Sequence, residues 1–189
     1  MRFLKTDDPR AVEETAAALL AGGVAAIPTD TVYGLAAHPG RPEAVERLYS
    51  IKGRDRRKPI ALLADCAGSV ARFGAVLSGA AADLARAHWP GALTLVLPCG
   101  GGFEGFRVPD CAFARELAAA CGGVLRVTSA NLSGCAAAQD APAALAAVGL
   151  SCDIVADGGP ARAGVASTVV RFASAGAPPE VLRQGPVAV

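Results

Sequence analysis

The sequence predicts a single α/β domain in which helices pack on a mixed, twisted sheet. The chain has 189 residues, of which 52% are hydrophobic, and a domain commonly contains about 100 to 200 residues. Short apolar runs that suit buried strands alternate along the chain with apolar residues at helical spacing. No repeat of fixed period and no linker interrupts this alternation, so we expect residues 1–189 to form one domain.

Each expected element has a local signal. Asp8 as N-cap, Pro9 in the first turn and Gly22 as a stop mark the first helix. Apolar residues at helical spacing follow Pro42, and Ala-rich segments come later. We therefore expect helices at 8–22, after Pro42, at 69–88 as one or two helices, from beyond Pro109 to 121, and near 141–148. Short runs rich in Val, Ile and Leu predict strands at 24–27, 60–63, 93–97, 106–108, 124–128, 153–156, 168–172 and 181–183, with a surface loop at 174–179.

Composition excludes several classes of protein. A long run without a formal charge, 88–103, is broken by proline and glycine, whereas a membrane span needs about 18 unbroken apolar residues. The amino terminus becomes acidic at Asp7 and Asp8 before any apolar run begins, which is the wrong order for a secretory signal, so we expect a cytoplasmic protein. The six cysteines form no C-x-x-C, and we expect them to be reduced and to bind no metal.

Positive charge is concentrated in the segment KGRDRRK, Lys52 to Lys58. The whole chain has a net charge of +1, and this segment has five basic residues and one acid, or +4, which leaves −3 elsewhere. Lys52 lies seven positions after Val45 and should face the inner side of its helix, and Gly53 allows the backbone to approach a ligand closely. The segment is a candidate polyphosphate site, although basic residues at a helix end are commonly only a solvated face.

Two predicted strands are each followed by a turn rich in hydroxyl groups. PTDTVYG follows strand 24–27, and TSANLSG follows strand 124–128. Ligand crevices in open α/β sheets form at the carboxyl ends of strands. The alternative is that each turn satisfies only its own backbone. Two such turns, together with the basic segment and internal arginines at Arg107 and Arg183, favour a ligand site.

Other nucleotide and nucleophile motifs do not fit. No glycine precedes a lysine, which excludes a P-loop. GGGFEG matches G-x-G-x-x-G at Gly100, Gly102 and Gly105, but a strand follows it where a dinucleotide site needs a helix, so we expect a hairpin. No G-x-S-x-G is present and the two histidines are His38 and His88, so catalysis by a Ser/His pair is not expected.

A series of motifs runs in order from about residue 24 to the carboxyl terminus: PTDTVYGL, K-G-R followed by KPIALL, WPGALTLVLP, RVPD, TSANLSG, GVASTVV and VLRQG. This series resembles the YrdC-like family of threonylcarbamoyl-AMP synthases. The resemblance implies an α/β twisted sheet with a positively charged central cavity. It also implies a nucleotidyltransferase that condenses L-threonine, bicarbonate and ATP into threonylcarbamoyl-AMP and pyrophosphate for the threonylcarbamoyladenosine modification of tRNA.

The resemblance also implies roles for individual residues. Lys52 and Arg54 would be catalytic. ATP would be bound by Lys52, Arg54, Lys58, Ser129, Asn131 and Arg183. L-threonine would be bound by Thr31, Arg107, Ser167 and the backbone around Val127. Because both reactants are anions, fixed positive charge can bring them together without a covalent nucleophile. ATP is expected with Mg²⁺, with no tightly bound cofactor.

Partners follow from the same resemblance. Contact with tRNA or double-stranded RNA has been attributed to relatives, and the product would pass to tRNA threonylcarbamoyl-transferase proteins; no membrane partner is expected. The chain ends soon after VLRQG and so resembles the short bacterial form, without the extra C-terminal domain of longer relatives.

Some positions depart from the residues usual in the family. They are Leu63, where some relatives have His, and Ala92, Cys111, Ala137 and Gln184. Two other functions stay open on the sequence. One is a YrdC-like enzyme that forms carbamoyl-adenylate from carbamoyl phosphate, and the other is an RNA-binding module without catalysis. The near-neutral net charge disfavours the RNA-binding module.

Overall fold

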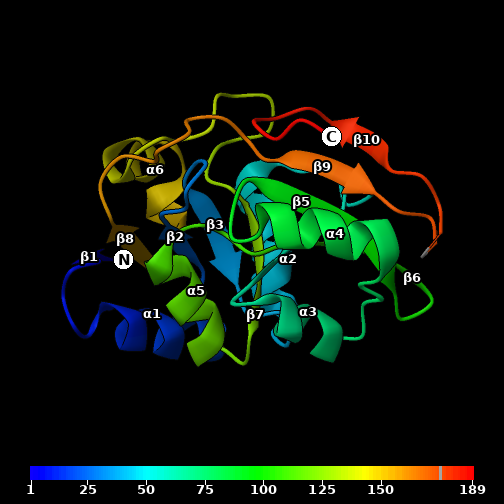
Figure 1. Ribbon diagram of the computed structural model, residues 1–189. Coiled ribbons are helices and arrows are strands. Elements are labelled where there is room, and N and C mark those ends of the chain that lie inside the picture. The colour runs from blue at the N-terminus through cyan, green and yellow to red at the C-terminus, as the bar shows by residue number, and fades with distance from the viewer. Residues whose placement is uncertain (175) are drawn as a thin grey trace.

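The computed structural model describes residues 1–174 and 176–189. They form a single mixed α/β domain with one ten-stranded sheet, in the strand order β1-β8-β2-β3-β7-β4-β6-β5-β9-β10 (Figure 1). The predicted fold class is confirmed. Ala175, within the loop expected at 174–179, lies outside the described residues. None of the helices in the described ranges has both the length and the apolar character that a membrane span requires.

Helices and strands alternate along most of the chain. The strands are β1 Arg2–Lys5, β2 Ala25–Ile27, β3 Gly34–Ala37, β4 Leu62–Ala64, β5 Leu93–Cys99, β6 Gly102–Arg107, β7 Val124–Ser129, β8 Ile154–Asp157, β9 Thr168–Arg171 and β10 Glu180–Arg183. The helices are α1 Ala11–Leu20, α2 Pro42–Lys52, α3 Ala67–Arg72, α4 Gly79–His88, α5 Ala112–Ala120 and α6 Ala141–Val148, with a 3-10 turn at Gly149–Ser151.

Strands β1 and β3 were not expected, and α1 begins later than expected. The sequence of β3, GLAA, has no strand signal of its own; its pairing with β2 and β7 makes it a strand. Asp8 lies in a turn before α1, where its Oδ1 accepts a hydrogen bond from Arg10 N (2.8 Å), so it does not cap the helix. The hairpin expected at GGGFEG is confirmed between β5 and β6, with Gly100 and Gly101 at φ +57° and +82°.

The two halves of the sheet are covered differently. Around β2, β3 and β8, α2 and α6 pack on one face and α1 and α5 on the other. Successive residues of β2 and its start point to opposite faces of the sheet. Val24 and Ala26 pack in the core with α2 and α6, and Ala25 and Ile27 pack in the core with α1 and α5. Strands β4, β6, β5 and β9 pack against α3 and α4 with one face only. Their other face lines a cavity.

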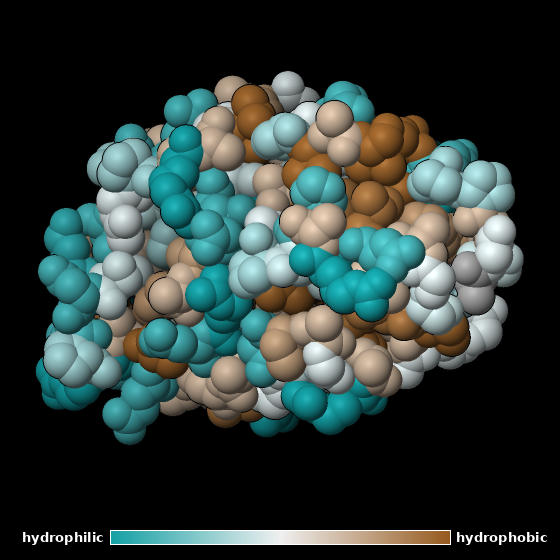
Figure 2. Space-filling model, viewed as in Figure 1, coloured by the Kyte–Doolittle hydropathy of each residue, from teal (hydrophilic) through white to brown (hydrophobic). Residues whose placement is uncertain are grey.

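The outer surface also differs between the two ends of the sheet. Figure 2 shows apolar side chains gathered over β9 and β10, whereas the end near β1 is mostly hydrophilic in this view. Val181 and Leu182 on β10 contribute to the apolar end, with 43% and 50% of their surface exposed. Leu182 also lines the cavity, so the apolar region continues from the surface into the cavity wall.

Candidate active site

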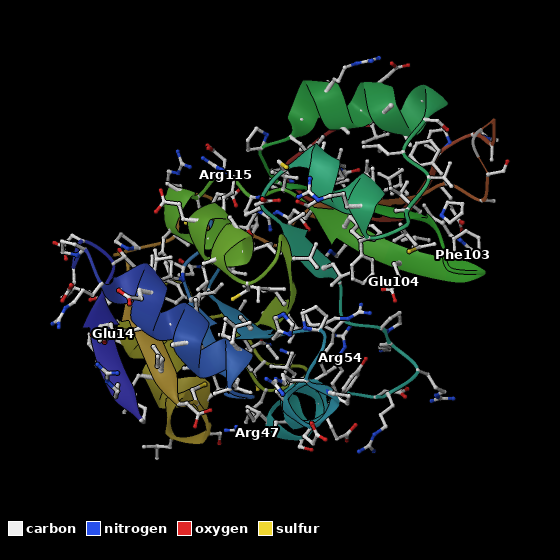
Figure 3. All side chains as sticks on the ribbon, turned by 90° about the horizontal axis from the view of Figure 1, so that it is seen from below. Glu14, Arg47, Arg54, Phe103, Glu104 and Arg115 are labelled. Carbon is white, nitrogen blue, oxygen red and sulfur yellow. The ribbon has the colours of Figure 1, made fainter. Side chains whose placement is uncertain are left out.

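A cavity of about 470 Å³ opens on the uncovered face of β4, β6, β5 and β9. Four arginines line it, namely Arg54, Arg107, Arg171 and Arg183, and no carboxylate does among its described lining residues. Figure 3 shows Arg54 next to α2, on the side toward the hairpin that carries Phe103. The cavity is therefore cationic and central, as the resemblance to the family implies.

The two hydroxyl-rich turns meet at one wall of this cavity. β2 and β7 run in the same direction on either side of β3, which pairs antiparallel with both. The turns that follow them are joined through the main chain, because Ala130 N donates to Tyr33 O at 2.8 Å. Gly34 is required between them, since a Cβ there would lie 2.6 Å from Cγ1 of Val127. The carboxyl ends of two strands thus supply one side of the site, as predicted.

Lys52, the last residue of α2, is 3% exposed. Its Nζ lies near four acceptors: Ser129 O at 2.5 Å, Asn131 O at 2.8 Å, Asn131 Oδ1 at 3.0 Å and Ser129 Oγ at 3.3 Å. Its carbonyl accepts from Ser133 N at 2.8 Å. The structure therefore brings Lys52 together with Ser129 and Asn131, but the lysine holds the turn and is not among the residues that line the cavity.

The surroundings of Lys52 favour loss of its proton. Burial, and to a smaller extent the charge of Arg54, lower the pKa of Lys52 from 10.5 to about 8. All four of its acceptors are neutral oxygen atoms. The ammonium still predominates at pH 7, where its three N–H groups can serve these acceptors. Among the described residues, no carboxylate pairs with this buried cation.

Asn131 also forms hydrogen bonds within the same turn through its side chain. It is 7% exposed, and its side-chain amide donates to the carbonyls of Leu132 and Cys135, both at 2.8 Å. Ser129 is the residue of this group that lines the cavity. Lys52 and Asn131 thus fix the position at which Ser129 faces a ligand.

Arg54 and Lys58 are placed differently from each other. Arg54 lines the cavity, and its Nε and Nη2 donate to the carbonyls of Lys58 (2.9 Å) and Pro59 (3.1 Å). Lys58 is exposed, and its side chain is not among the described residues that line the cavity. Its main chain braces Arg54 instead.

The rest of the basic segment is a solvated face. Arg56 pairs with Glu46 and Arg57 pairs with Asp55, with side-chain exposures of 72% and 90% for the two arginines. Arg56 and Arg57 therefore form the kind of solvated face that basic residues at a helix end commonly form, whereas Arg54 lines the cavity.

Arg107, at the end of β6, is 8% exposed. Its Nη2 donates to Asp30 Oδ1 (2.5 Å), its Nη1 to Thr31 Oγ1 (2.7 Å) and its Nε to Gly91 O (2.9 Å). Burial lowers the pKa of Arg107, and the charge of Asp30 opposes this effect. The arginine remains charged at any physiological pH. The structure thus brings together Arg107 and Thr31, which were predicted as site residues, and adds Asp30, which was not.

The hydroxyl group of Thr29 forms hydrogen bonds with the backbone of its own turn. Its Oγ1 donates to Val32 O (2.7 Å) and lies within hydrogen-bond distance of the main-chain nitrogens of Thr31 and Val32. This local bonding is the alternative considered for both turns. It holds for Thr29, whereas Thr31 Oγ1 accepts a hydrogen bond from Arg107 on β6.

A pair of hydroxyl groups, from Ser167 and Thr94, lies on the β5–β9 side of the cavity. Ser167 Oγ is 2.8 Å from Thr94 Oγ1, and Arg183 donates to Ser167 Oγ (3.2 Å) and Ser167 O (3.0 Å). Burial is the first cause that lowers the pKa of Arg183, followed by repulsion from Arg107 and Arg54. Repulsion among these arginines shows that the cavity holds a positive charge that an anion would offset.

An apolar wall faces these polar groups. Leu63, the position where some relatives have His, is 4% exposed and lines the cavity together with Val127. The main-chain N of Val127 donates to Ala61 O at 2.9 Å. In this chain the wall therefore offers van der Waals contact where a histidine would offer a hydrogen bond.

The other departures from the family pattern lie on the framework. The Cys111 thiol donates to Pro28 O (3.6 Å), and the Gln184 amide donates to two main-chain carbonyls of its own loop (2.9 and 2.8 Å). The carbonyl of Ala92 accepts from Thr168 N at 3.0 Å. Neither these three residues nor Ala137 are among the described residues that line the cavity.

Sequence reasoning missed Asp30, Thr94 and Arg171. Asp30 lies between two threonines of the first turn, and its position there was the one signal that could have singled it out. Thr94 and Arg171 alternate with core residues on β5 and β9, and this period-2 pattern could have placed them on the cavity face. The guanidinium of Arg171 lies 4.4 Å from the ring centroid of Phe103, which keeps it at the cavity wall.

The Sua5/YciO/YrdC family model, described as "Telomere recombination", matches residues 17–185. The chain belongs to this family. A Mycobacterium leprae protein that is provisionally named a threonylcarbamoyl-AMP synthase is 36% identical over 95% of this chain and 85% of its own length. The threonylcarbamoyl-AMP synthase of Bacillus subtilis is 34% identical over 90% of this chain and 52% of its own length. The resemblance predicted from the motifs is thus confirmed.

A solved member of the family has closely similar architecture. The crystal structure of P. abyssi Sua5 complexed with L-threonine matches this chain with a TM-score of 0.88 at 28% identity, over 96% of this chain and 56% of that chain. A metal site is a separate question: the described residues contain no group of three or more His, Cys, Asp or Glu side chains that could hold a metal ion.

Proposed function

We propose that this Sua5/YciO/YrdC member is an L-threonylcarbamoyladenylate synthase. It condenses L-threonine, bicarbonate and ATP into threonylcarbamoyl-AMP and pyrophosphate, and the product serves the threonylcarbamoyladenosine modification of tRNA. The observation that carries this proposal is one cationic cavity that is lined by Arg107, which donates to Thr31 Oγ1, and also by Arg54 and Ser129. Its relatives in M. leprae and B. subtilis bear the name of this activity.

The nucleotide is proposed to lie at the Arg54 end. Arg54, Arg183 and Ser129 face the cavity and would contact its phosphates directly. Lys52 and Asn131 would act through the turn that presents Ser129. Lys58 would contribute positive charge at the surface. Arg54 remains proposed as a catalytic residue, because it lines the cavity and has access to the reacting groups. Lys52, for which the resemblance implies a catalytic role, is proposed to act as a positioning residue.

The amino acid is proposed to lie at the Arg107 end. Arg107 would bind its carboxylate, Thr31 and Ser167 would donate or accept hydrogen bonds, and the chain around Val127 would pack against it. A site built to hydrogen-bond a substrate hydroxyl rejects analogues that lack it. Thr94 and Ser167, paired at 2.8 Å, offer such groups.

The chemistry follows from these positions. Bicarbonate loses hydroxide to give carbon dioxide, and the amine of threonine forms a bond to its carbon. The proton that the nitrogen loses combines with the hydroxide to form water, which leaves a carbamate. A carbamate oxygen then attacks the α-phosphorus of ATP, and pyrophosphate leaves. The arginines bring two anions together and stabilise the charge that develops on the phosphoryl oxygens. Neither step requires a nucleophile from the protein.

Magnesium enters this proposal as part of the substrate. The residues that line the cavity include no carboxylate in the described chain, so the protein offers no hard oxygen cage for a resident divalent ion. Mg²⁺ would arrive bound to the phosphates of ATP. The arginines would then neutralise the phosphate charge that the ion leaves.

Partners, location and extent complete the proposal. The product would pass to tRNA threonylcarbamoyl-transferase proteins, and contact with tRNA or double-stranded RNA would run over the exposed basic segment 56–58. Because the product serves tRNA, we place the enzyme in the cytoplasm. We propose that residues 1–189 act as one YrdC-like domain.

The decisive test is pyrophosphate release by the purified protein with ATP, bicarbonate and each amino acid in turn. Release that requires L-threonine is expected. Release that requires carbamoyl phosphate and ignores threonine would instead identify a carbamoyl-adenylate-forming enzyme. Salt-dependent RNA affinity with no release under any condition would identify an RNA-binding module.

A further inference from the structure

Asp30 lies behind the cavity and not on it. Its side chain is 9% exposed, and it is absent from the described residues that line the cavity, although Thr29 and Thr31 on either side of it do line it. Its carbonyl accepts from Ala163 N at 3.0 Å, which anchors the backbone at this point. The proposed function gives Asp30 no role, yet it is a buried carboxylate in contact with a residue that lines the site.

Asp30 and two other groups fix the orientation of Arg107. A guanidinium has five N–H groups in one plane. Hydrogen bonds to Asp30, Thr31 and Gly91 occupy one N–H on each of the three nitrogens of Arg107. One N–H on Nη1 and one on Nη2 have no hydrogen bond within the described chain. Because Arg107 lines the cavity, these two N–H groups suit one carboxylate bound by both oxygens.

Arg107 differs in charge balance from Arg54 and Arg183, two of the other arginines of the cavity. Arg54 and Arg183 donate to main-chain carbonyls and a serine hydroxyl, which are neutral. Arg107 and Asp30 together carry no net charge, at a contact of 2.5 Å. A polyphosphate is attracted by net positive charge, whereas a carboxylate can be selected by the geometry of two N–H groups. The two ends of the cavity therefore differ in which anion they favour.

We infer that Asp30 is a positioning residue that makes Arg107 a site for a single carboxylate and keeps the triphosphate of ATP away from the amino-acid end of the cavity. This inference rests on the proposed function. Without the carboxylate of Asp30, Arg107 would be a buried cation with unbalanced charge and a less fixed plane. It would bind threonine less well and polyphosphate better.

The test uses three variants of the whole chain and inorganic tripolyphosphate as the probe. Formation of threonylcarbamoyl-AMP from radiolabelled L-threonine is measured for the unaltered protein, Asp30→Asn, Asp30→Glu and Asp110→Asn. Asp110→Asn is the matched control, because it removes a carboxylate that pairs with the surface residue Arg162 (2.8 Å), outside the proposed site. Circular dichroism checks that each variant is folded.

In Asp30→Asn we expect the KM for L-threonine to rise about tenfold or more, since a charge-assisted hydrogen bond is lost, with a smaller change in kcat. Tripolyphosphate should compete only with ATP in the unaltered protein and also with threonine in Asp30→Asn. Asp30→Glu keeps the carboxylate and should show a smaller rise in KM with no competition against threonine. Asp110→Asn should behave like the unaltered protein.

Two results would overturn the inference: an unchanged threonine KM in Asp30→Asn, or tripolyphosphate that never competes with threonine in that variant. If Asp30→Asn does not fold, Asp30→Glu decides, because a loss confined to kcat there would also overturn it. Failure of the proposed function is distinguishable, since the unaltered protein itself would then form no threonine-dependent product.

Discussion

Lys52 and Arg107 are both buried cations beside the same cavity, at 3% and 8% exposure, but the chain balances them in opposite ways. Arg107 has a carboxylate partner at 2.5 Å and keeps two N–H groups for a ligand. Lys52 has four neutral acceptors within one turn and is not among the described residues that line the cavity. Arg107 is thus arranged to bind, and Lys52 to hold other groups in place.

The difference also predicts how each residue responds to change. A buried charge that is balanced by a carboxylate leaves an uncompensated partner behind when either member is removed. A buried charge that serves neutral oxygens leaves unsatisfied acceptors behind. Loss of Lys52 should therefore damage both the turn and the reaction, and loss of Arg107 should also destabilise the fold because Asp30 is left unpaired. Loss of Arg54, which donates to main-chain carbonyls, should damage mainly the reaction.

Lys52→Ala is expected to have the largest effect. It should nearly abolish turnover, by about a hundredfold or more, because Ser129 loses the group that positions it. It should also lower the free energy of unfolding by about 2–4 kcal/mol, since several buried oxygens lose their donor. Pyrophosphate release and urea unfolding measure the two effects. Lys5→Ala is the control: the side chain of that lysine is 65% exposed, and its loss should leave stability close to that of the unaltered protein. Near-normal turnover in Lys52→Ala would show that Lys52 has no role in the reaction.

Arg54→Ala tests the contrast between a cavity-lining arginine and the buried Lys52, because it should lower turnover without lowering stability. Arg54 lines the cavity and is braced only by the carbonyls of Lys58 and Pro59 among the described residues. We expect turnover to fall about a hundredfold and the free energy of unfolding to change by less than about 1 kcal/mol. Arg57→Ala, at 90% side-chain exposure, is the matched control and should keep full turnover. Equal losses in both variants would mean that the segment acts only through its total charge.

The pH dependence of stability provides a further test of Lys52. Its pKa is about 8 in the folded chain and 10.5 as a reference for the unfolded chain. Between these values the unfolded state keeps a proton that the folded state has lost, so the free energy of unfolding rises with pH, by up to about 1.4 kcal/mol per unit. Urea unfolding at pH 7, 8, 9 and 10 should show this rise as a difference between the unaltered protein and Lys52→Met. A flat difference would show that the folded chain does not depress the pKa of Lys52.

Local sequence signals were sufficient for most of the fold and insufficient for two strands. Runs such as 93–97 and 124–128 carry enough β-branched and Leu residues to be recognised alone. β3 does not: GLAA becomes a strand because β2 and β7 lie on either side of it with open hydrogen-bonding edges. β1 is likewise a strand through its parallel pairing with the distant β8. Such pairings depend on topology, which no local window contains.

The candidate site was likewise predictable only in part from the sequence. Arg54, Arg107 and Arg183 could be named from motifs, and all three line the cavity. The bond from Arg107 to Asp30 spans 77 positions and required the pairing of β4 with β6 and of β3 with β7 to be known. Motifs could also not predict that Lys52 donates to the turn it was grouped with, because that depends on which way a side chain points at the end of α2.

Lys58→Ala is expected to have the smallest effect. Lys58 braces Arg54 with its carbonyl at 2.9 Å, which alanine retains, and its exposed ammonium contributes only a screened surface charge. We expect the KM for ATP to rise by less than about fivefold at low ionic strength and to match the unaltered protein at about 0.5 M salt. Steady-state kinetics at both salt concentrations measure this, with Arg54→Ala run alongside as the variant whose defect should persist in high salt. A salt-independent loss in Lys58→Ala as large as that of Arg54→Ala would mean that the lysine reaches the nucleotide directly, and that loop 53–59 changes its position when ATP binds.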